Sequence, residues 1–553
     1  MALQGQDERT RLLQTPQASS LPNVARRTGL DLEKREKWSL LAGCLLAAFL
    51  GTIDVTIVAA LVQVISADFG ASERAGWLGT SFLLANITFT PLYGRLCDIL
   101  GRRGANASAI TCFLVGTVLC TVAPTMNVLL LGRFIAGIGG GGMQTTLAVV
   151  ISDLFPLRER ALVSSIGGFL WALGGALGGP IGGILSDWLG WRSAFAFQIP
   201  LLALSLLSNL KLLNYDVSNA RKGETLRDKL KRVDFLGCLS LFISCAAALT
   251  SLSLRNTQNF PWSHPLVIVL TVTAVIAIIA FFVVEARVAQ EPILPLGIFK
   301  RRIPLFVMVT TFTVAVCNFA MMYNLPLYFL TVEGTSASEA GEHLLFNSIG
   351  NAVGGFAAGI LLHKTGKYRL PAAVLGLGGV LGVGLVASLT PESSVFVKWF
   401  GVVPMGFAFI FMLNSTLTAL LACTHPSQVA TVTGALWLFR TAGQVSGVAV
   451  SAAILQTTLG IALNNKITGH GAKHIIERIR RDSSIIATLP ASVQQAARDS
   501  YAVALKSVFA FCAVFAFLAW LSCIFIPQLD LDNPVAHAKP SQDLEQDDRQ
   551  VPS

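Results

Sequence analysis

Apolar residues in this 553-residue chain form long runs separated by short polar segments. A helix needs about 20 apolar residues to cross a bilayer. The predicted spans are 39–62, 75–96, 105–123, 127–151, 161–185, 194–214, 234–254, 265–285, 304–330, 343–362, 371–390, 395–422, 428–456 and 503–527. The run at 304–330 is the weakest of them, because it contains Asn318, Asn324 and Pro326. The pattern predicts an all-α polytopic membrane protein with fourteen transmembrane helices and both termini on one side.

Basic residues concentrate in alternate loops. One set of loops carries Arg102, Arg103, Arg158, Arg160, Lys229, Lys231, Arg232, Lys300, Arg301 and Arg302. The short loops on the other side carry only Arg74, Arg192, Arg255 and Lys398. Cytoplasmic loops are enriched in Lys and Arg, so we expect the basic loops and both termini in the cytoplasm. The segment 457–502 is basic but predicted outside, and long loops follow this rule poorly.

Composition supports a lipid environment. The chain is 53% hydrophobic and 13% charged, whereas ordinary soluble domains are about 25% charged. The net charge of +10 lies in short loops rather than on a folded basic face, which argues against nucleic-acid binding. No CxxC pair or Walker-type phosphate loop occurs, so we expect no metal, no cofactor, no enzyme activity and no ATP-driven pump. We expect a monomer embedded in the lipid bilayer.

An internal repeat divides the chain. "GRLCDILGRR" (94–103) follows the second span, and "GILLHKTGKYR" (359–369) follows the tenth, each with two glycines seven residues apart. A Gly-rich helix follows each copy, at 167–183 and 434–450. Repeated halves are typical of secondary transporters, whose substrate site lies between the halves. The predicted division is a cytoplasmic disordered tail (1–38), a six-helix half (39–214), a basic loop (215–233), two inserted helices (234–285), a second six-helix half with a long outer loop at 457–502 (286–527), and an acidic tail (528–553).

One carboxylate, Asp54, interrupts the first span. An aspartate at a helix centre costs about 2.5–3.5 kcal/mol on insertion scales, and such residues commonly mark ion pathways. Burial favours the neutral form, so Asp54 is a candidate group for proton coupling or for contact with a cationic substrate. A structural aspartate bonded to a neighbouring helix is the alternative.

Two arginines also fall inside predicted spans. Arg133 in "LLLGRFIAGIGGGGMQ" is either a partner of the proton site or an interfacial anchor. Arg440 either contacts a substrate carboxylate or fixes helix packing. Candidate cavity amides are Asn318, Asn324, Asn347, Asn351 and Asn414, although buried asparagines commonly bond neighbouring helices.

Small and charged residues mark two segments as candidates for conformational change. In "GRLCDILGRR", Gly94 and Gly101 frame Asp98, Arg102 and Arg103, which together form a candidate conformational latch. In "GGALGGPIGG", the candidate sliding surface contains Gly179, Pro180, Gly182 and Gly183. In the amino-terminal tail, Glu8, Leu12 and Leu13 fit the acidic-dileucine spacing of adaptor-dependent sorting signals. We therefore include a sorting adaptor among the expected partners.

These motifs resemble the major facilitator superfamily over residues 38–527, in its 14-helix drug:proton antiporter branch. "GRLCDILGRR" resembles the loop 2–3 signature, "DVTIVAAL" the helix-1 motif and "GRFIAGIGGGG" the helix-4 motif. "GGALGGPIGG" resembles the antiporter helix-5 motif, and "GWRSAFAFQIP" the segment after it. The resemblance implies that Asp54 takes part in proton coupling. The second repeat copy departs from the first, with His363 at the place of Asp98.

Within the branch, the motifs look most like those of fungal vacuolar basic amino-acid transporters. The resemblance implies an antiporter that moves basic amino acids from the cytosol into the vacuole in exchange for protons. The expected partners are therefore a small cationic solute and protons, and the expected location is the vacuolar membrane. A plasma-membrane multidrug:proton exporter, a siderophore transporter and a nutrient sensor on the same scaffold remain as alternatives.

Overall fold

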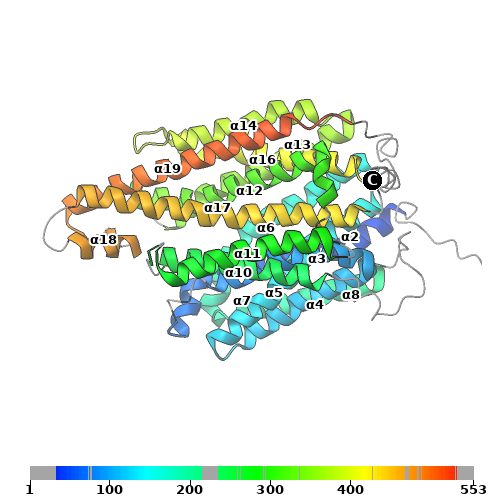
Figure 1. Cartoon of the computed structure of the whole chain (residues 1–553), viewed down its shortest axis with the longest axis horizontal. Coiled ribbons are helices and arrows are strands. Elements are labelled where there is room, and N and C mark those ends of the chain that lie inside the picture. Colours follow the sequence, from blue (N-terminus) through cyan, green and yellow to red (C-terminus); the bar gives the residue numbers. More distant parts are fainter. Residues whose placement is uncertain are drawn as a thin grey trace, which may run out of the picture.

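The chain forms an elongated bundle of helices that run side by side along its long axis (Figure 1). The computed structural model describes residues 33–531 except 72–73, 75–76, 214–233, 258–259, 262, 290–291, 293, 295, 336, 426–427, 468–471, 482–484, 487–488 and 530. The sorting motif with Glu8, Leu12 and Leu13, the loop 215–233 and nearly all of the tail 528–553 lie outside the described residues.

The first half of the bundle contains six crossings. Its helices are α2 (Lys34–Asp68), α3 (Trp77–Ile99), α4 (Gly101–Val122), α5 (Met126–Leu154), α6 (Leu157–Leu189), α7 (Ser193–Ala196) and α8 (Gln198–Leu212), with α7 and α8 sharing one crossing. Glycines let these helices approach closely. A Cβ added at Gly116 of α4 would overlap the backbone of α5 at Ala136.

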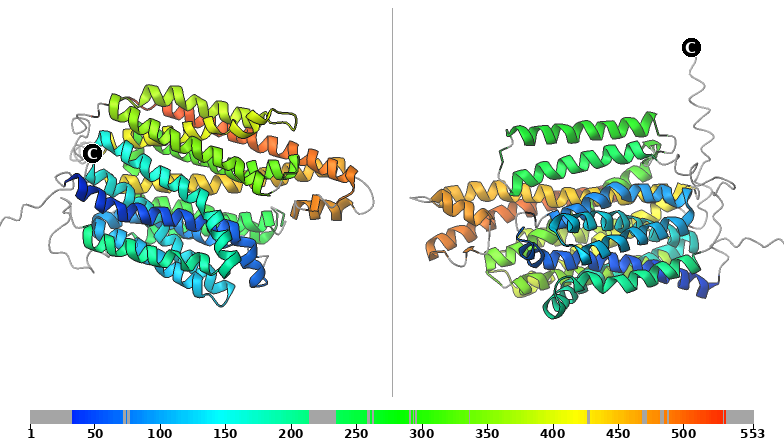
Figure 2. Two further views of the ribbon diagram at one scale, coloured as in Figure 1. Left: turned by 180° about the vertical axis from the view of Figure 1, so that it is seen from behind. Right: turned by 90° about the horizontal axis from the view of Figure 1, so that it is seen from below.

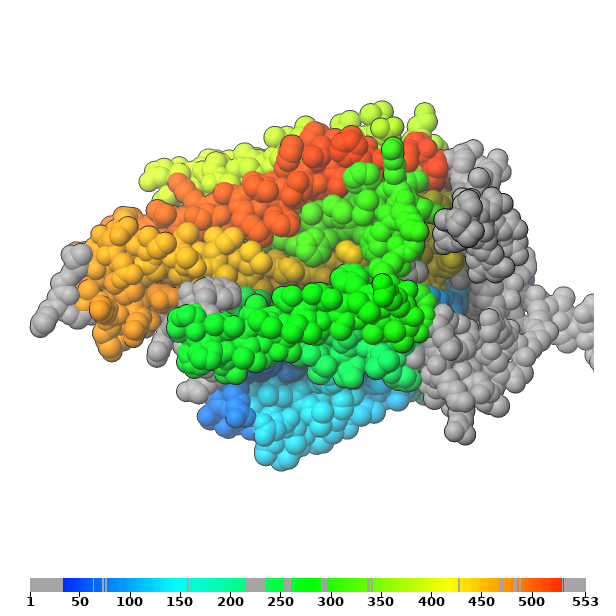
Figure 3. Space-filling view, viewed as in Figure 1, coloured from blue at the N-terminus to red at the C-terminus, as the bar shows by residue number. Residues whose placement is uncertain are grey.

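The next two crossings are α10 (Phe235–Thr257) and α11 (Pro265–Arg287), which pack chiefly on each other. Ser244 of α10 donates a hydrogen bond to the carbonyl of Ala274 in α11. The pair lies outside the main bundle and contacts it through α3 and α17 (Figure 2). In the space-filling view it forms a ridge across one face of the molecule (Figure 3). Many of its apolar side chains are exposed, as expected for a surface that meets lipid.

The second half begins after a short 3₁₀ turn, η3 (Leu296–Lys300). Its elements are α12 (Arg302–Tyr328), a π-helical turn η4 (Phe329–Glu333), α13 (Ala337–Thr365), α14 (Arg369–Ala387), α15 (Val395–Phe400), α16 (Val403–Ala422), α17 (Val429–Lys466), α18 (Ala472–Arg481) and α19 (Ala491–Ile524). The first crossing, α2, begins at the same end of the bundle at which the last, α19, ends (Figure 1). Helices α4, α12 and α14 also begin at this end. Since the first residues of α12 and α14 are Arg302 and Arg369, we call it the basic end.

The expected fold class is confirmed, with one difference in the hydropathy of the spans. In the described part of the chain, thirteen helices are long and apolar enough to cross a membrane. The crossing absent from that set is α3, whereas α12, the weakest expected span, is one of the thirteen. Helix α3 carries polar residues that face the protein interior, including Ser81, Thr88 and Thr90. Their hydroxyls donate to carbonyls of the same helix, so α3 needs less apolar surface than a lipid-facing helix.

The segment 457–502, expected as a long outer loop, is largely helical. Helix α17 continues to Lys466 and α19 begins at Ala491, with α18 between them at the end opposite the basic end (Figure 1). Ile476 and Ile479 of α18 are buried, and Tyr501 of α19 donates a hydrogen bond to the carbonyl of Ile479. Apolar residues at helical spacing therefore fold this segment into a cap, which we define as residues 457–502.

Candidate functional site

The candidate proton-coupling residues form an ion pair inside the first half of the bundle. Arg133 Nη1 of α5 donates to Asp54 Oδ2 of α2 at 2.5 Å. Each residue is only 1% exposed. Sequence reasoning allowed Arg133 to be an interfacial anchor, but its burial and its carboxylate partner exclude that role. A buried pair of this kind is costly to separate, because either partner alone would be an uncompensated charge.

Further contacts hold Arg133 in place. Its Nε donates to the carbonyl of Leu78 at 3.3 Å, and its guanidinium lies 4.6 Å from the ring centroid of Phe82, both in α3. The second carboxylate oxygen of Asp54 is buried and has no hydrogen-bond partner among the described residues.

The helix-5 glycines divide between two surfaces of α6. Gly178 and Gly182 pack against α2, where an added Cβ would meet Thr56 and Ile57. A Cβ added at Gly179 or Gly183 would meet no other helix within 4 Å, and Pro180 is exposed. The predicted sliding surface therefore consists of one row in close contact with the helix that carries Asp54 and one row beside open space.

The expected latch residues meet at the basic end. Arg102 donates from Nε to Asp153 Oδ2 at 2.8 Å and from Nη1 to Asp98 Oδ1 at 3.0 Å. Asp98 Oδ2 accepts a hydrogen bond from Thr431 of α17 at 3.3 Å, which links the two halves. Arg103 is exposed and makes no such link. Asp153 and Thr431 were not found from the sequence, because neither stands out from its neighbours.

Gly94 and Gly101 of this motif are required for different structural reasons. A Cβ added at Gly94 would lie 2.7 Å from the carbonyl oxygen of Ala430 and 3.0 Å from the Cα of Gly434, so α3 and α17 touch through bare backbone. Gly101 has φ of +77°, which favours glycine at the turn between α3 and α4. Its counterpart in the second copy, Gly366, has φ of +64°. His363, at the place of Asp98, is exposed.

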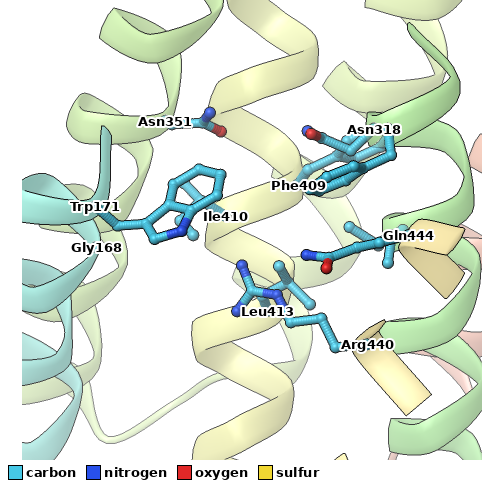
Figure 4. A pocket seen from close by; sticks show the side chains of 12 residues that line it. Gly168, Trp171, Asn318, Asn351, Phe409, Ile410, Leu413, Arg440 and Gln444 are labelled. Atoms are coloured by element: carbon cyan, nitrogen blue, oxygen red, sulfur yellow. The ribbon is translucent and has the colours of Figure 1, made fainter. Parts of the chain in front are cut away.

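A cavity lies between the two halves. It is lined by Gly168 and Trp171 of α6, Val314, Ala315, Asn318 and Phe319 of α12, Asn351 of α13, Phe409, Ile410 and Leu413 of α16, and Arg440 and Gln444 of α17. Its empty space is about 460 Å³, including space open to solvent. Arg440 and Gln444 reach into it from α17, and the indole of Trp171 faces them from α6 (Figure 4).

The candidate cavity residues are thus only partly brought together. Arg440, Asn318 and Asn351 line the cavity. Asn347 instead packs against Gly406, and Asn414 donates to Ser165 Oγ at 3.4 Å. Trp171 and Gln444 were missed, because an aromatic or an amide within an apolar run does not by itself indicate a site.

Asp54 and Arg133 do not line this cavity. The sequence allowed Asp54 to contact a cationic substrate, but in this conformation its carboxylate lies apart from the cavity. The reason is topological: Asp54 faces α5 and α3 within one half, whereas most of the cavity wall belongs to the other half.

Contacts between the halves separate the cavity from the basic end. Gly94 meets Gly434 along one edge, and Ser165 of α6 donates to the carbonyl of Gly355 of α13 at 2.5 Å along another. Gly434 of α17, Ser165 of α6 and Gly355 of α13 each lie between the cavity-lining positions of their helix and the basic end. Toward the opposite end, Gly175 and Gly179 continue the face of α6 that carries Gly168, and a Cβ added at either would meet no other helix within 4 Å. The two halves are therefore in direct contact between the cavity and the basic end.

A family model described as Major Facilitator Superfamily matches residues 44–448. The chain belongs to the major facilitator superfamily. As a member of this superfamily it is a multi-pass membrane protein and a secondary transporter of small solutes, not an enzyme.

Curated relatives of this superfamily member divide between two activities. It is 34% identical to "Multidrug resistance protein fnx1" of Schizosaccharomyces pombe, over 95% of this chain and 98% of the relative. It is 30% identical to "Vacuolar membrane amino acid uptake transporter fnx2" of the same yeast, over 89% and 84%. It is 29% identical to "Vacuolar basic amino acid transporter 1" of Saccharomyces cerevisiae, over 84% and 86%.

Solved structures share the fold at low identity. The human organic anion transporter MFSD10 matches with a TM-score of 0.55 and 16% identity, over 87% of this chain and 99% of that one. The proton:xylose symporter XylE matches with a TM-score of 0.56 and 15% identity, over 92% and 100%. These likenesses bear on the fold alone.

Proposed function

We propose that this protein is a proton-coupled antiporter that moves basic amino acids from the cytosol into the vacuole. The observation that carries the proposal is the buried Asp54–Arg133 pair. A transporter that needed only passive helix packing would not have to bury two opposite charges inside one half of its bundle. We assign the basic end to the cytoplasm, since the positive-inside rule places Lys- and Arg-rich loops there.

Protonation of Asp54 would remove the negative partner of Arg133 and so alter the contact between α2 and α5. Because α2 also packs on the glycines of α6, a change at Asp54 reaches the helix that lines the cavity with Gly168 and Trp171. We therefore propose indirect coupling, in which proton and solute bind at separate places and share the α2–α6 contact. An acidic lumen would supply the proton, and the latch of Asp98 and Arg102 would hold the cytoplasmic side closed at that stage.

The proposed substrate class and the proposed vacuolar location are supported by two relatives. The fnx2 protein and vacuolar basic amino acid transporter 1 are described by their names as vacuolar amino-acid carriers. Multidrug export at the plasma membrane is a second candidate function, favoured by the 34% identity to fnx1 over nearly the whole chain. The aromatic lining of the cavity, which includes Trp171, Phe319 and Phe409, would also suit an apolar drug.

The test is ATP-dependent uptake of radiolabelled lysine, arginine and histidine into vacuolar vesicles. Wild type is compared with Asp54→Asn, with and without a protonophore. Asp187→Asn is the matched control, because Asp187 is exposed and lies outside the cavity lining. Protein levels in the vesicles are matched by immunoblot.

We expect the protonophore and Asp54→Asn each to abolish uptake, with Asp187→Asn unchanged. Wild-type uptake no greater than that of vesicles from a deletion strain would overturn the amino-acid assignment and favour drug export. Uptake that survives Asp54→Asn but not the protonophore would instead move proton coupling to another group.

A further inference from the structure

The side chains that line the cavity carry positive charge but no negative charge. Of the residues that line it, Arg440 is the only one with a charged side chain, and none is acidic. The other polar lining side chains are the amides of Asn318, Asn351 and Gln444 and the indole of Trp171. A solute that carries only positive charge would find no counter-charge in this cavity and would be repelled by Arg440.

Arg440 has no anionic partner in the part of the chain that the structure describes. Its guanidinium lies 4.7 Å from the ring centroid of Trp437. It makes no hydrogen bond or ion pair with any described residue, whereas Arg102 and Arg133 both have carboxylate partners. An arginine inside a membrane bundle normally pairs with a negative group or with carbonyls. The free face of Arg440 points into the cavity beside Gln444 (Figure 4).

Asp54 cannot serve as that partner in this conformation. It is buried in the first half of the bundle and already paired with Arg133. The cavity is therefore the place from which a negative group can reach Arg440.

We propose that Arg440 binds the carboxylate of the transported solute. A guanidinium offers two parallel N–H donors that match the two oxygens of a carboxylate. Gln444, one turn further along α17, supplies an additional amide donor. The inference rests on the proposed function and narrows it: the recognised solutes carry a carboxylate, as amino acids do, and purely cationic compounds are excluded.

The rest of the solute would lie toward the other half. Trp171 faces Arg440 across the cavity from α6 (Figure 4). A cationic side chain is attracted to the face of an indole ring. A basic amino acid would thus contact both α17 and α6, one helix from each half. Its binding would therefore favour closure of the cavity.

The test compares a carboxylate with its amide. The full-length protein in nanodiscs is titrated with arginine and with argininamide, and the ratio of the two dissociation constants is measured. The variants are Arg440→Gln and Arg440→Lys. Arg478→Gln, an exposed arginine on α18, is the matched control for the same substitution.

We expect wild type and Arg478→Gln to bind arginine at least about tenfold more tightly than argininamide, as for loss of a hydrogen-bonded charge pair. Arg440→Gln should bring the ratio close to one. Arg440→Lys should give an intermediate ratio, because lysine keeps the charge but loses the two-point geometry. If Arg440→Lys kept the full preference for arginine over argininamide, charge attraction alone would explain that preference. The proposal of two-point binding would then be overturned.

Two outcomes distinguish this inference from the proposed function. If wild type binds arginine and argininamide equally, carboxylate recognition is wrong while amino-acid transport stands. If wild type binds neither but prefers phenylalanine to phenylalaninamide through Arg440, the inference stands and the basic-amino-acid assignment is wrong. The first reading uses wild-type protein alone, and the second adds the comparison of wild type with Arg440→Gln.

Discussion

The two members of the buried ion pair should respond differently to neutralisation. Asp54→Asn leaves the guanidinium of Arg133 buried, still held by the carbonyl of Leu78 and the ring of Phe82. A guanidinium cannot give up its proton in a protein. Removing one partner of a buried pair costs about 3–5 kcal/mol, and because the remaining guanidinium keeps its full charge we expect Asp54→Asn to lie at the upper end of that range.

Arg133→Gln leaves a buried carboxylate instead, and a carboxylate can become neutral by taking up a proton. We therefore expect a smaller loss of stability in Arg133→Gln, and one that shrinks as the pH falls. Asp54→Asn itself recovers no stability in this way, because the guanidinium that it leaves behind keeps its charge. The double variant, which has no buried charge at this site, should be more stable than the sum of the two single effects predicts.

The assay is thermal unfolding of the purified protein in detergent at several pH values, for wild type, both single variants and the double variant. Asp187→Asn controls for a change of the same kind at an exposed position. Equal losses in the two single variants that add in the double variant would refute the reasoning, because they would show that the two charges do not interact.

Three other predictions follow from neighbouring contacts. Gly178→Ala should destabilise the protein, because its Cβ would overlap α2, whereas Gly179→Ala has open space and should not; unfolding temperatures of the pair compare the two. Gly94→Ala should weaken closure of the basic end, since its Cβ would lie 2.7 Å from a backbone oxygen of α17; faster labelling of cysteines introduced near that end would report it. The hydrogen bond from Trp191 lowers the pKa of Asp68 below its ordinary value, so the stabilisation by this contact should persist at mildly acidic pH and disappear only as the pH falls through that lowered pKa. Asp68→Asn should remove this part of the acid dependence in the same unfolding assay.

The charged residues were predictable because charge is rare and costly inside a membrane helix. Asp54, Arg133 and Arg440 each interrupt a long apolar run, and all three have a distinct place in the structure. The repeated motif also predicted the latch. Its first copy needs glycine at Gly94, where α3 touches α17, and at Gly101, where φ is positive.

What the sequence left open depends on how helices distant in sequence face one another. The distance between Asp54 and Arg133 is set by the relative rotation of α2 and α5, which no local pattern specifies. Trp171 and Gln444 became visible as cavity residues only once α6 and α17 were placed opposite each other. The polar residues of α3 were not recognised as inward-facing, because hydropathy measures how apolar a segment is and not which neighbour it meets.

Helix α17 carries several of these features on one piece of backbone. It is 38 residues long, about 57 Å at 1.5 Å per residue, and contains no proline. Thr431 bonds the latch near its first turn, Arg440 faces the cavity, and Gln456 bonds Arg480 of the cap further along. Because about 20 residues suffice to cross a bilayer, we expect the cap end of α17 to extend beyond the membrane. An antibody fragment clamped on the cap would then hold one end of this helix, and we expect it to restrict movement at the opposite end without entering the transport route.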